Sequence, residues 1–320
     1  MFEYLITRPL GWIINLIYSL VANYGLAIIL FTIIIKLILL PLNVRSQKAM
    51  RKQQKIQPIL QELQAKYAND QEKLQREMMK LYKENNVSMT GGCLPMFIQM
   101  PILIGLYQVI QKPISYLVGV DWMQQEIIDK VYMLRDAMAP HIGNLAQQTE
   151  EALANMSQIQ LSQWAGIVNG PTDPWVINFN FLGMNLANTP SAALNYLMRF
   201  DFSNPGVIAL LIIPVLAVVS QMLTTKLTQI QSGQTKETAK TDEANPANQM
   251  TKSMMWMMPL MTGFFTFTLP SGIGIYWIIS SITQMIQQLV LNKYFENKGE
   301  EVIIKTPERK QLHGKKSKKR

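Results

Sequence analysis

The hydrophobic and polar positions along the chain follow the pattern of an α-helical membrane protein. Residues 23–42 form an apolar run of about 20 residues, and a helix of that length, at about 1.5 Å per residue, crosses the roughly 30 Å hydrocarbon core of a bilayer. Four later apolar runs, interrupted by Met or Gln, are near the minimum length for a span. We therefore expect five spans, in residues 23–42, 91–111, 205–225, 253–269 and 271–292.

Residues 1–22 predict an amphipathic helix that lies along the membrane interface outside the cell. The aromatic residues Trp12 and Tyr18 occur there beside the polar Asn15 and Ser19. Aromatic side chains are enriched at membrane–water interfaces, where one end of the ring is apolar and the other is wet. The chain would then turn into the bilayer at residue 23.

Residues 43–90 predict a helical hairpin. Apolar residues recur at helical spacing in two halves that are separated by Ala68-Asn69-Asp70: Ile56, Leu60, Leu63 and Tyr67, then Leu74, Met78 and Leu81. Two such stripes can bury one another, as in an antiparallel helix pair. The alternative is a solvated, charged linker, which has no need to keep this spacing.

The distribution of Lys and Arg predicts the orientation of the spans. Residues 45–83 hold ten of these basic residues, whereas residues 113–204 hold three. Cytoplasmic loops carry an excess of Lys and Arg, so the hairpin is expected in the cytoplasm. Alternation then places residues 1–22 and 112–204 outside, and the flexible segment 226–252 and the basic tail 293–320 inside. In residues 112–204, Phe179, Phe181, Leu182 and Met184 are expected at the outer interface.

Composition excludes several kinds of chemistry. The chain is 48% hydrophobic, carries a net charge of +9, and has one cysteine, Cys93, which excludes an internal disulfide. Its two histidines, His141 and His313, lie outside the expected spans, and no zinc-binding or nucleotide-binding motif is present. The sequence therefore predicts no catalytic residue, metal or cofactor, and a protein that is not an enzyme.

Lys36 is the one charged residue in the run 23–42. A charge near the middle of a span costs about 2.5–3.5 kcal/mol on insertion scales, and such residues usually face a bundle interior or a water-filled cavity. In the alternative, Lys36 snorkels to the interface beyond Leu42, about 9 Å away. That route runs against the lean of helical side chains toward the N-terminus, so we predict a hydrated cavity.

Four stretches of the sequence together resemble the YidC family of membrane protein insertases. They are LLPL at 39–42, LYKENNVSMTGGCLPMFIQMPI at 81–102, NQMTKSMMWMMP at 248–259 and LPSGIGIYWIISSITQMIQQ at 269–288. The similarity covers most of residues 9–112 and 179–295. It implies an all-α bundle of five spans around a hydrophilic groove that is open to the cytoplasm and to lipid and closed toward the outside.

The resemblance also implies which residues line the groove. Lys36 occupies the position of a family arginine, which keeps the charge but loses the planar fork of the guanidinium. Thr32, Gln221 and Trp277 match other groove positions. Two alternatives stay open, because Gln221 could instead be a hydrogen-bond donor between helices and Trp277 could be an interface anchor.

Gly91 and Gly92 are expected to form a hinge between the hairpin and the second span, since glycine permits reorientation at little steric cost. Ser88-Met89 stands where the family commonly has Asn-Pro, so the sequence departs from the family next to this hinge.

The function implied is a membrane protein insertase and chaperone in the bacterial cell membrane, with client membrane proteins and the lipid bilayer as partners and no cofactor. The Sec translocon, targeting factors and the ribosome are further candidate partners, the ribosome through ribosomal RNA and the basic tail. The alternatives are a small-solute or ion transporter and a scaffold that binds ribosomes without inserting clients. No Asp or Glu lies in any expected span, which weakens a proton-coupled transporter.

Overall fold

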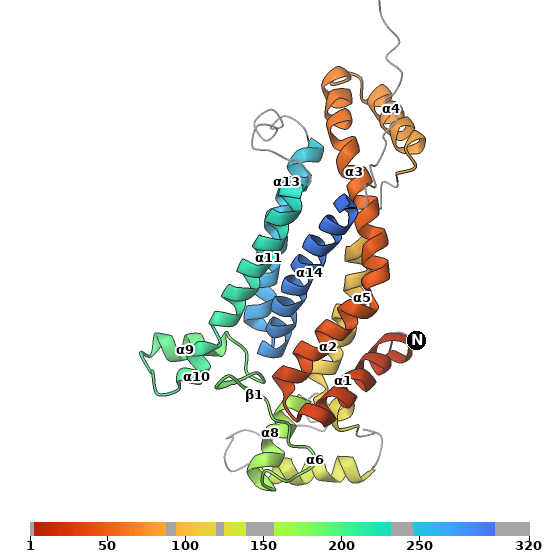
Figure 1. Cartoon of the computed structure of the whole chain (residues 1–320). Helices are drawn as coiled ribbons and strands as arrows, with labels where there is room; N and C mark the ends of the chain where they lie inside the picture. The colour runs from red at the N-terminus through yellow and green to blue at the C-terminus, as the bar shows by residue number, and fades with distance from the viewer. Residues whose placement is uncertain (1–2, 88–93, 120–124, 139–156, 232–245, 298–320) are drawn as a thin grey trace, which may run out of the picture.

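The computed structural model describes residues 3–87, 94–119, 125–138, 157–231 and 246–297, and Figure 1 shows their arrangement. In this part of the chain nearly all regular structure is helical. The strands are a single two-residue pair, β1 (Asn180–Phe181) and β2 (Met184–Asn185), with Phe181 opposite Met184. The expected all-α class of the protein is therefore confirmed.

Long helices form the body of the molecule, and shorter ones gather at one end of it (Figure 1). The long ones are α1 (Arg8–Val21, preceded by the π-helix η1, Glu3–Thr7), α2 (Tyr24–Ile38), α3 (Leu40–Lys66), α4 (Gln71–Glu84), α5 (Leu94–Gln111), α11 (Ile212–Gln231), α13 (Pro246–Thr268) and α14 (Ser271–Asn297). The helices at that end are η2 (Ile114–Val118), α6 (Gln125–Met138), α8 (Gln158–Val168), α9 (Ala192–Met198) and α10 (Pro205–Ala209), none longer than 14 residues.

Three of the long helices, α2, α11 and α14, run in the same direction. At their N-terminal ends Gly272 of α14 lies against Tyr24 of α2, where an added Cβ would be 2.9 Å from the ring, and Gly274 lies against Ile213 of α11. Near the other end Gln288 of α14 donates a hydrogen bond to Thr228 of α11. The helices α5 and α13 run the opposite way, since α5 leads into η2 beside α8 and α13 turns directly into α14.

Residues 112–204, called here the long segment, are tied to the N-terminal ends of α2 and α14. Backbone carbonyls of the long segment accept hydrogen bonds from the first N–H groups of both helices: Asn178 from Tyr24 (3.0 Å), Asn188 from Ser271 (3.1 Å) and Leu186 from Gly272 (3.3 Å). The first N–H groups of a helix have no partner within it, so these bonds satisfy them. The long segment thus covers this end of the bundle.

The long segment also adds aromatic side chains to the core. Phe179 is buried and packs edge-on against Tyr24, with ring centroids 4.9 Å apart, and Phe181 packs against Gly25. The start of α2 covers the ring of Phe179, so this side chain is in the protein interior, and its position at the level of the outer interface stays a prediction. Leu182, at the turn between β1 and β2, is exposed.

The hairpin segment consists of α3 and α4. Helix α3 follows α2 after a bend of 61° at Leu39, and Asp70 caps α4 by accepting a hydrogen bond from the Lys73 backbone N–H at 3.0 Å. The facing sides bury a small apolar cluster built on Ile56, Leu60, Leu81 and Tyr82. These are helical stripes of the kind that the sequence pattern predicts.

By length and composition, two helical stretches of the described residues are able to cross a membrane, Glu3–Val21 and Pro205–Thr228. The bent pair α2–α3 makes a third if it counts as one span. Helix α1 buries Ile14 and Ile17 and exposes Trp12 and Leu20. The expectation that α1 lies along the membrane interface stays a prediction. Helix α14 is not among these stretches, and it carries Ser280, Ser281, Thr283, Gln284, Gln287 and Gln288 along its middle turns.

Candidate functional site

Buried polar side chains gather where α2, α11 and α14 meet. Thr32 and Lys36 of α2, Thr224 of α11 and Gln288 of α14 lie in the halves that point away from the long segment, and Ser280 and Ser281 lie near the middle of α14. The opposite halves are sealed by apolar side chains, among them Ile28, Phe31, Ile213 and Ile273. This interior is therefore polar toward one end and apolar toward the other.

Lys36 lies inside this polar half. Its side chain is only 7% exposed, and within the described residues no carboxylate or hydrogen-bond acceptor partners its ammonium. A buried cation is costly unless it is paired or hydrated, so an unpaired one marks a place where an anionic or strongly polar group would be stabilised. Thr32 lies one turn earlier on the same face of α2, and its hydroxyl donates to the Ile28 carbonyl at 2.6 Å.

The bend between α2 and α3 lies directly beside Lys36. Pro41 has no N–H and cannot continue the helical hydrogen bonds of α2. The Leu37 carbonyl thereby loses its helical donor, and the neighbouring Lys36 carbonyl accepts a hydrogen bond from the Gln287 side chain of α14 at 3.1 Å. The oxygen of the same amide accepts from the Asn43 side chain of α3 at 3.3 Å. Gln287 thus bridges both sides of the bend, and sequence reasoning did not single it out.

Gln221 joins α11 to α14. The Ser281 hydroxyl donates to the Gln221 side-chain oxygen at 3.2 Å, and Thr224 donates to the Ser281 carbonyl at 3.4 Å. The sequence left a hydrogen bond between helices as an alternative, with Gln221 as the donor; in the bond to Ser281, Gln221 is the acceptor. The side chain of Gln221 is half-buried, and its role as a lining residue of a groove stays a prediction.

Trp277 lies in the second turn of α14 and contacts α13. Its ring stacks on Phe265 with centroids 6.3 Å apart and an angle of 10° between the rings. The sequence candidates Lys36, Thr32, Gln221 and Trp277 therefore lie on helices that all contact α14, either as neighbours or as part of it. Gly91 and Gly92 lie outside the described residues, as does most of the basic tail.

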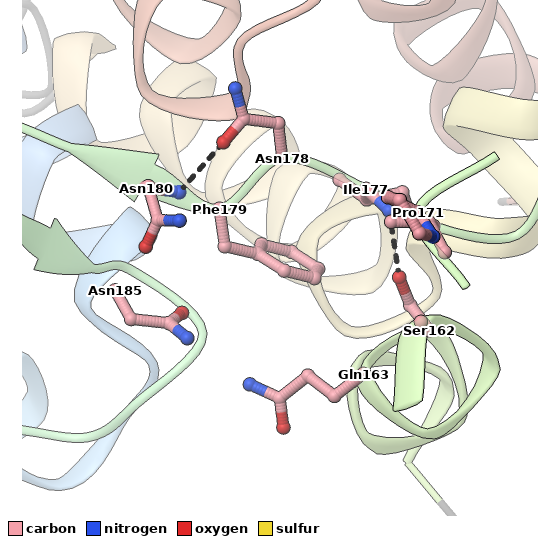
Figure 2. Close-up of a pocket in the computed structure, with 10 residues that line it drawn as sticks. Ser162, Gln163, Pro171, Ile177, Asn178, Phe179, Asn180 and Asn185 are labelled. Atoms are coloured by element: carbon pink, nitrogen blue, oxygen red, sulfur yellow. Dashed lines mark hydrogen bonds between the residues drawn. The ribbon is translucent and has the colours of Figure 1, made fainter. Parts of the chain in front are cut away.

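A separate hollow of about 350 Å³ lies in the long segment, between α8 and the strand pair (Figure 2). Its lining includes Ser162, Gln163, Asn178, Asn180 and Asn185. Ser162 accepts a hydrogen bond from the Ile177 backbone N–H at 3.0 Å, and the Asn178 side chain accepts from the Asn180 backbone N–H at 3.2 Å. These polar groups support the neighbouring backbone. Across the described residues, no group of three or more His, Cys, Asp or Glu could hold a metal ion.

Comparison with known proteins adds the family. The family model described as 60Kd inner membrane protein matches residues 16–298. A protein of Listeria innocua named membrane protein insertase YidC 2 is 27% identical over 307 residues, which is 93% of this chain and 75% of the relative. A protein of Clostridium perfringens named membrane protein insertase YidC is 52% identical over 100 residues, 31% of this chain and 42% of the relative.

Other relatives are longer than this chain. A Nitratidesulfovibrio vulgaris protein named membrane protein insertase YidC is 48% identical over 110 residues, which cover 34% of this chain and 21% of the relative. The chain thus spans about a fifth of the length of that relative. The family match, in contrast, extends over both the helical body and the long segment. This chain belongs to the 60Kd inner membrane protein family.

Proposed function

We propose that this chain is a membrane protein insertase and chaperone of the bacterial cell membrane. The observation that carries the proposal is the buried Lys36, which has no anionic partner among the described residues and lies in the polar half of an otherwise apolar bundle. The names of the relatives support the same function. The proposal needs no cofactor and no catalytic residue.

The proposed topology has five spans, α2, α5, α11, α13 and α14, with residues 1–22 and the long segment outside and the hairpin, the segment 226–252 and the tail inside. The directions of the helices support it, because α2, α11 and α14 are parallel and α5 and α13 are antiparallel to them. The polar half of the interior then faces the cytoplasm, and the apolar half, covered by the long segment, faces outward.

In this mechanism a client segment enters the polar half from the cytoplasm. Lys36 attracts its acidic or polar flank in surroundings of low dielectric, where such an attraction is stronger than in water. This lowers the barrier to carrying a short hydrophilic tail across the membrane. Thr32, Gln221 and Trp277 line the route, and the apolar client helix leaves sideways along α5 and α13. The exposed Met257, Met258 and Met261 of α13 give a flexible surface for clients of different shape.

The candidate partners beyond clients and lipid are the Sec translocon, targeting factors and the ribosome. The tail beyond Tyr294 is rich in Lys and Arg and ends in KKSKKR, a composition that binds phosphate in a salt-dependent manner. Cosedimentation with ribosomes at rising salt tests this contact, by comparing the full chain with one truncated after Glu300. Equal binding of both chains would exclude the tail as a ribosome contact.

The test of the function is insertion of two matched single-span clients into liposomes, one with an acidic and one with a neutral external tail. The readout is protection of the client from added protease. Lys36→Arg should keep insertion because the charge and approximate reach are preserved. Lys36→Met should lose it, most strongly for the acidic client, since it keeps bulk and removes the charge.

Stability separates a functional loss from misfolding. Removing a cation from a span should ease folding by up to about 2.5–3.5 kcal/mol, less whatever hydration already recovers, so the Lys36→Met protein should be abundant. Insertion of both clients by Lys36→Met at the parental level would show that the charge is dispensable. Absence of protection with the unmodified chain would leave the transporter or scaffold alternatives.

A further inference from the structure

Helices α9 and α10 project sideways from the end of the bundle that the long segment covers (Figure 1), and an apolar patch lies on and beside them. It is built from large side chains of α9, of the turn between α9 and α10, and of the turn between β1 and β2: Leu182, Leu194, Met198, Phe200 and Phe202. Phe200 is 83% exposed and Leu182 is 81% exposed. Exposed apolar groups of this size and number usually mark a surface that another apolar phase covers.

Two residues of the patch also have an unusual backbone conformation. Among the described residues, only four that are not glycine have a positive φ, and two of them are Leu182 at 51° and Phe200 at 52°. Side chains other than glycine rarely adopt this region because Cβ crowds the carbonyl oxygen. In water, these two residues would carry both the strain and the exposure of an apolar side chain, so water is a poor environment for the patch.

The two turns are brought together by a close backbone approach. A Cβ at Gly206 of α10 would lie 2.6 Å from the Gly183 carbonyl oxygen, so only glycine permits this contact. The backbone N–H of Ser191, just before α9, donates to the Phe267 carbonyl of α13 at 3.0 Å. The patch is therefore fixed at the level where α13 ends and α14 begins.

The polar groups of the patch are occupied within the chain. Asp201 accepts a hydrogen bond from the Ser203 backbone N–H at 3.0 Å, and Asn204 accepts one from the Val207 backbone N–H at 3.3 Å. The charges at the patch are those of Arg199 and Asp201. Beyond α10 the exposed apolar surface continues onto α11 at Ile212, Val215 and Val219. The patch is thus continuous with a helix that is apolar and long enough to cross a membrane.

We propose that Leu182, Leu194, Met198, Phe200 and Phe202 form an anchor that enters the outer interfacial layer of the bilayer. The inference rests on the membrane placement proposed above. Lipid is the occupant because the patch borders the lipid-facing side of α11 and lies at the level of the span ends. The aromatic rings settle beside the headgroups, and Arg199 reaches the lipid phosphates. The anchor fixes the long segment over the outer end of the bundle.

The test measures the depth of a nitroxide label in liposomes made of neutral and anionic phospholipids. Cys93 is replaced by serine, and single cysteines are introduced as Phe202→Cys, Val215→Cys and Thr172→Cys. Oxygen concentrates in lipid and a nickel chelate stays in water, so their relative collision rates report depth. We expect the oxygen-to-nickel ratio to be several-fold greater at residue 202 than at residue 172, where an exposed turn should be in water.

Each other outcome is informative. If residue 202 collides mainly with nickel while residue 215 collides mainly with oxygen, the anchor is wrong and the membrane placement stands. If residue 215 also collides mainly with nickel, the placement of α11 fails and the anchor fails with it. If residue 202 is shielded from both reagents, a protein partner covers the patch and lipid does not. A Phe200→Ser, Phe202→Ser variant should leave the depth at residue 215 unchanged.

Discussion

At the scale of single residues, the amide of Gln287 connects the last helix to the bend beside Lys36. The Gln287→Leu variant keeps the volume but removes both hydrogen bonds, to the Lys36 carbonyl and from Asn43. The hydrogen bond to the Lys36 carbonyl is partly buried, and a typical hydrogen bond contributes about 0.5–1.5 kcal/mol, so we expect a lower unfolding temperature in detergent. The exposed neighbour Gln284 is the matched control, and Gln284→Leu should stay within about 0.5 kcal/mol of the parent. Equal unfolding temperatures for both variants would remove Gln287 from this role.

The ionisation of Asp173 should make the stability of the long segment depend on pH. Burial alone would raise the pKa of its carboxyl group, but hydrogen bonds from Lys130, Trp175 and Asn169, each 2.8 Å long, together with the Lys130 charge, hold the pKa below its ordinary value of 3.8. A lowered pKa in the folded state means that the stabilisation is present above about pH 4. It is lost as the pH falls through the lowered value.

We therefore expect Asp173→Asn to weaken the long segment at pH 7 and to make little difference at a pH below the lowered pKa of Asp173. The loss at pH 7 should be about 1–3 kcal/mol, since the hydrogen bonds involve a charged group. Hydrogen exchange of the backbone amides of α8 at both pH values, corrected for intrinsic rates, measures it. The control is Asp136→Asn, because the ion pair of Asp136 with Arg135 is exposed and should contribute less.

The sequence allowed Lys36 to be singled out because a lone charge in an apolar run is visible without any structure. The importance of Gln287 could not be predicted in this way. Its partner is the carbonyl of a residue 251 positions earlier in the chain, and a backbone carbonyl leaves no mark on the sequence. The positive φ of Phe200 could not be predicted from the sequence either, because phenylalanine most often has a negative φ.

At the scale of elements, α3 is held against the end of α14 as well as by its links along the chain. Arg51 donates to the Asn292 backbone carbonyl at 3.1 Å and to its side chain at 3.0 Å. Its guanidinium also lies over the buried Phe295 ring, 4.7 Å from the centroid. These contacts should hold the hairpin at a defined angle to the last helix.

Arg51→Ala should therefore loosen α3 from α14 without unfolding the hairpin. We expect faster hydrogen exchange in the first half of α3, corresponding to a loss of about 1–3 kcal/mol, and little change in α4. Lys52→Ala is the neighbouring control that removes a cation without these contacts. If exchange in α3 is the same in both variants, the hairpin is positioned by its chain connections alone.

The helical elements were largely predictable, and their ends were less so. Residues 23–42 were expected as one span, whereas α2 ends at Ile38 and α3 begins at Leu40, inside that range. The apolar composition continues through the bend, which arises from Pro41 and from contacts with α14 that composition does not record. Helix α14 likewise extends to Asn297, five residues past the expected end at 292, because Phe295 is buried.

At the scale of the whole molecule, the basic hairpin and the long segment lie at opposite ends of the bundle (Figure 1). In a Cys93→Ser background, the exposed positions Thr172 and Asn69 mark these two ends when each is replaced by cysteine. On intact cells, an impermeant maleimide should modify residue 172 and should modify residue 69 only after permeabilisation, because basic segments stay in the cytoplasm. Modification of both residues from one side would contradict the proposed alternation of spans.

The sequence indicates how many apolar runs there are. Which of the corresponding helices pack against each other could be learned only from the structure. Periodicity shows which face of a helix is apolar but does not tell which other helix covers it. In this bundle the first and last of the five proposed spans, α2 and α14, lie side by side. That pairing sets Thr32 and Lys36 of α2 beside α14, while Gln221 joins α14 from α11.

The pairing of α2 with α14 also sets the order of assembly during synthesis. Gln287 is made 251 residues after Lys36, and at about 5–20 residues per second the ribosome needs roughly 10–50 s to produce it. Throughout that interval Lys36 has already been translated and has neither Gln287 nor the rest of α14 beside it. A newly made chain therefore contains the Lys36 cation before the polar side chains of α14 have been made. Until then, lipid headgroups, water or an older copy of an insertase must stabilise this charge.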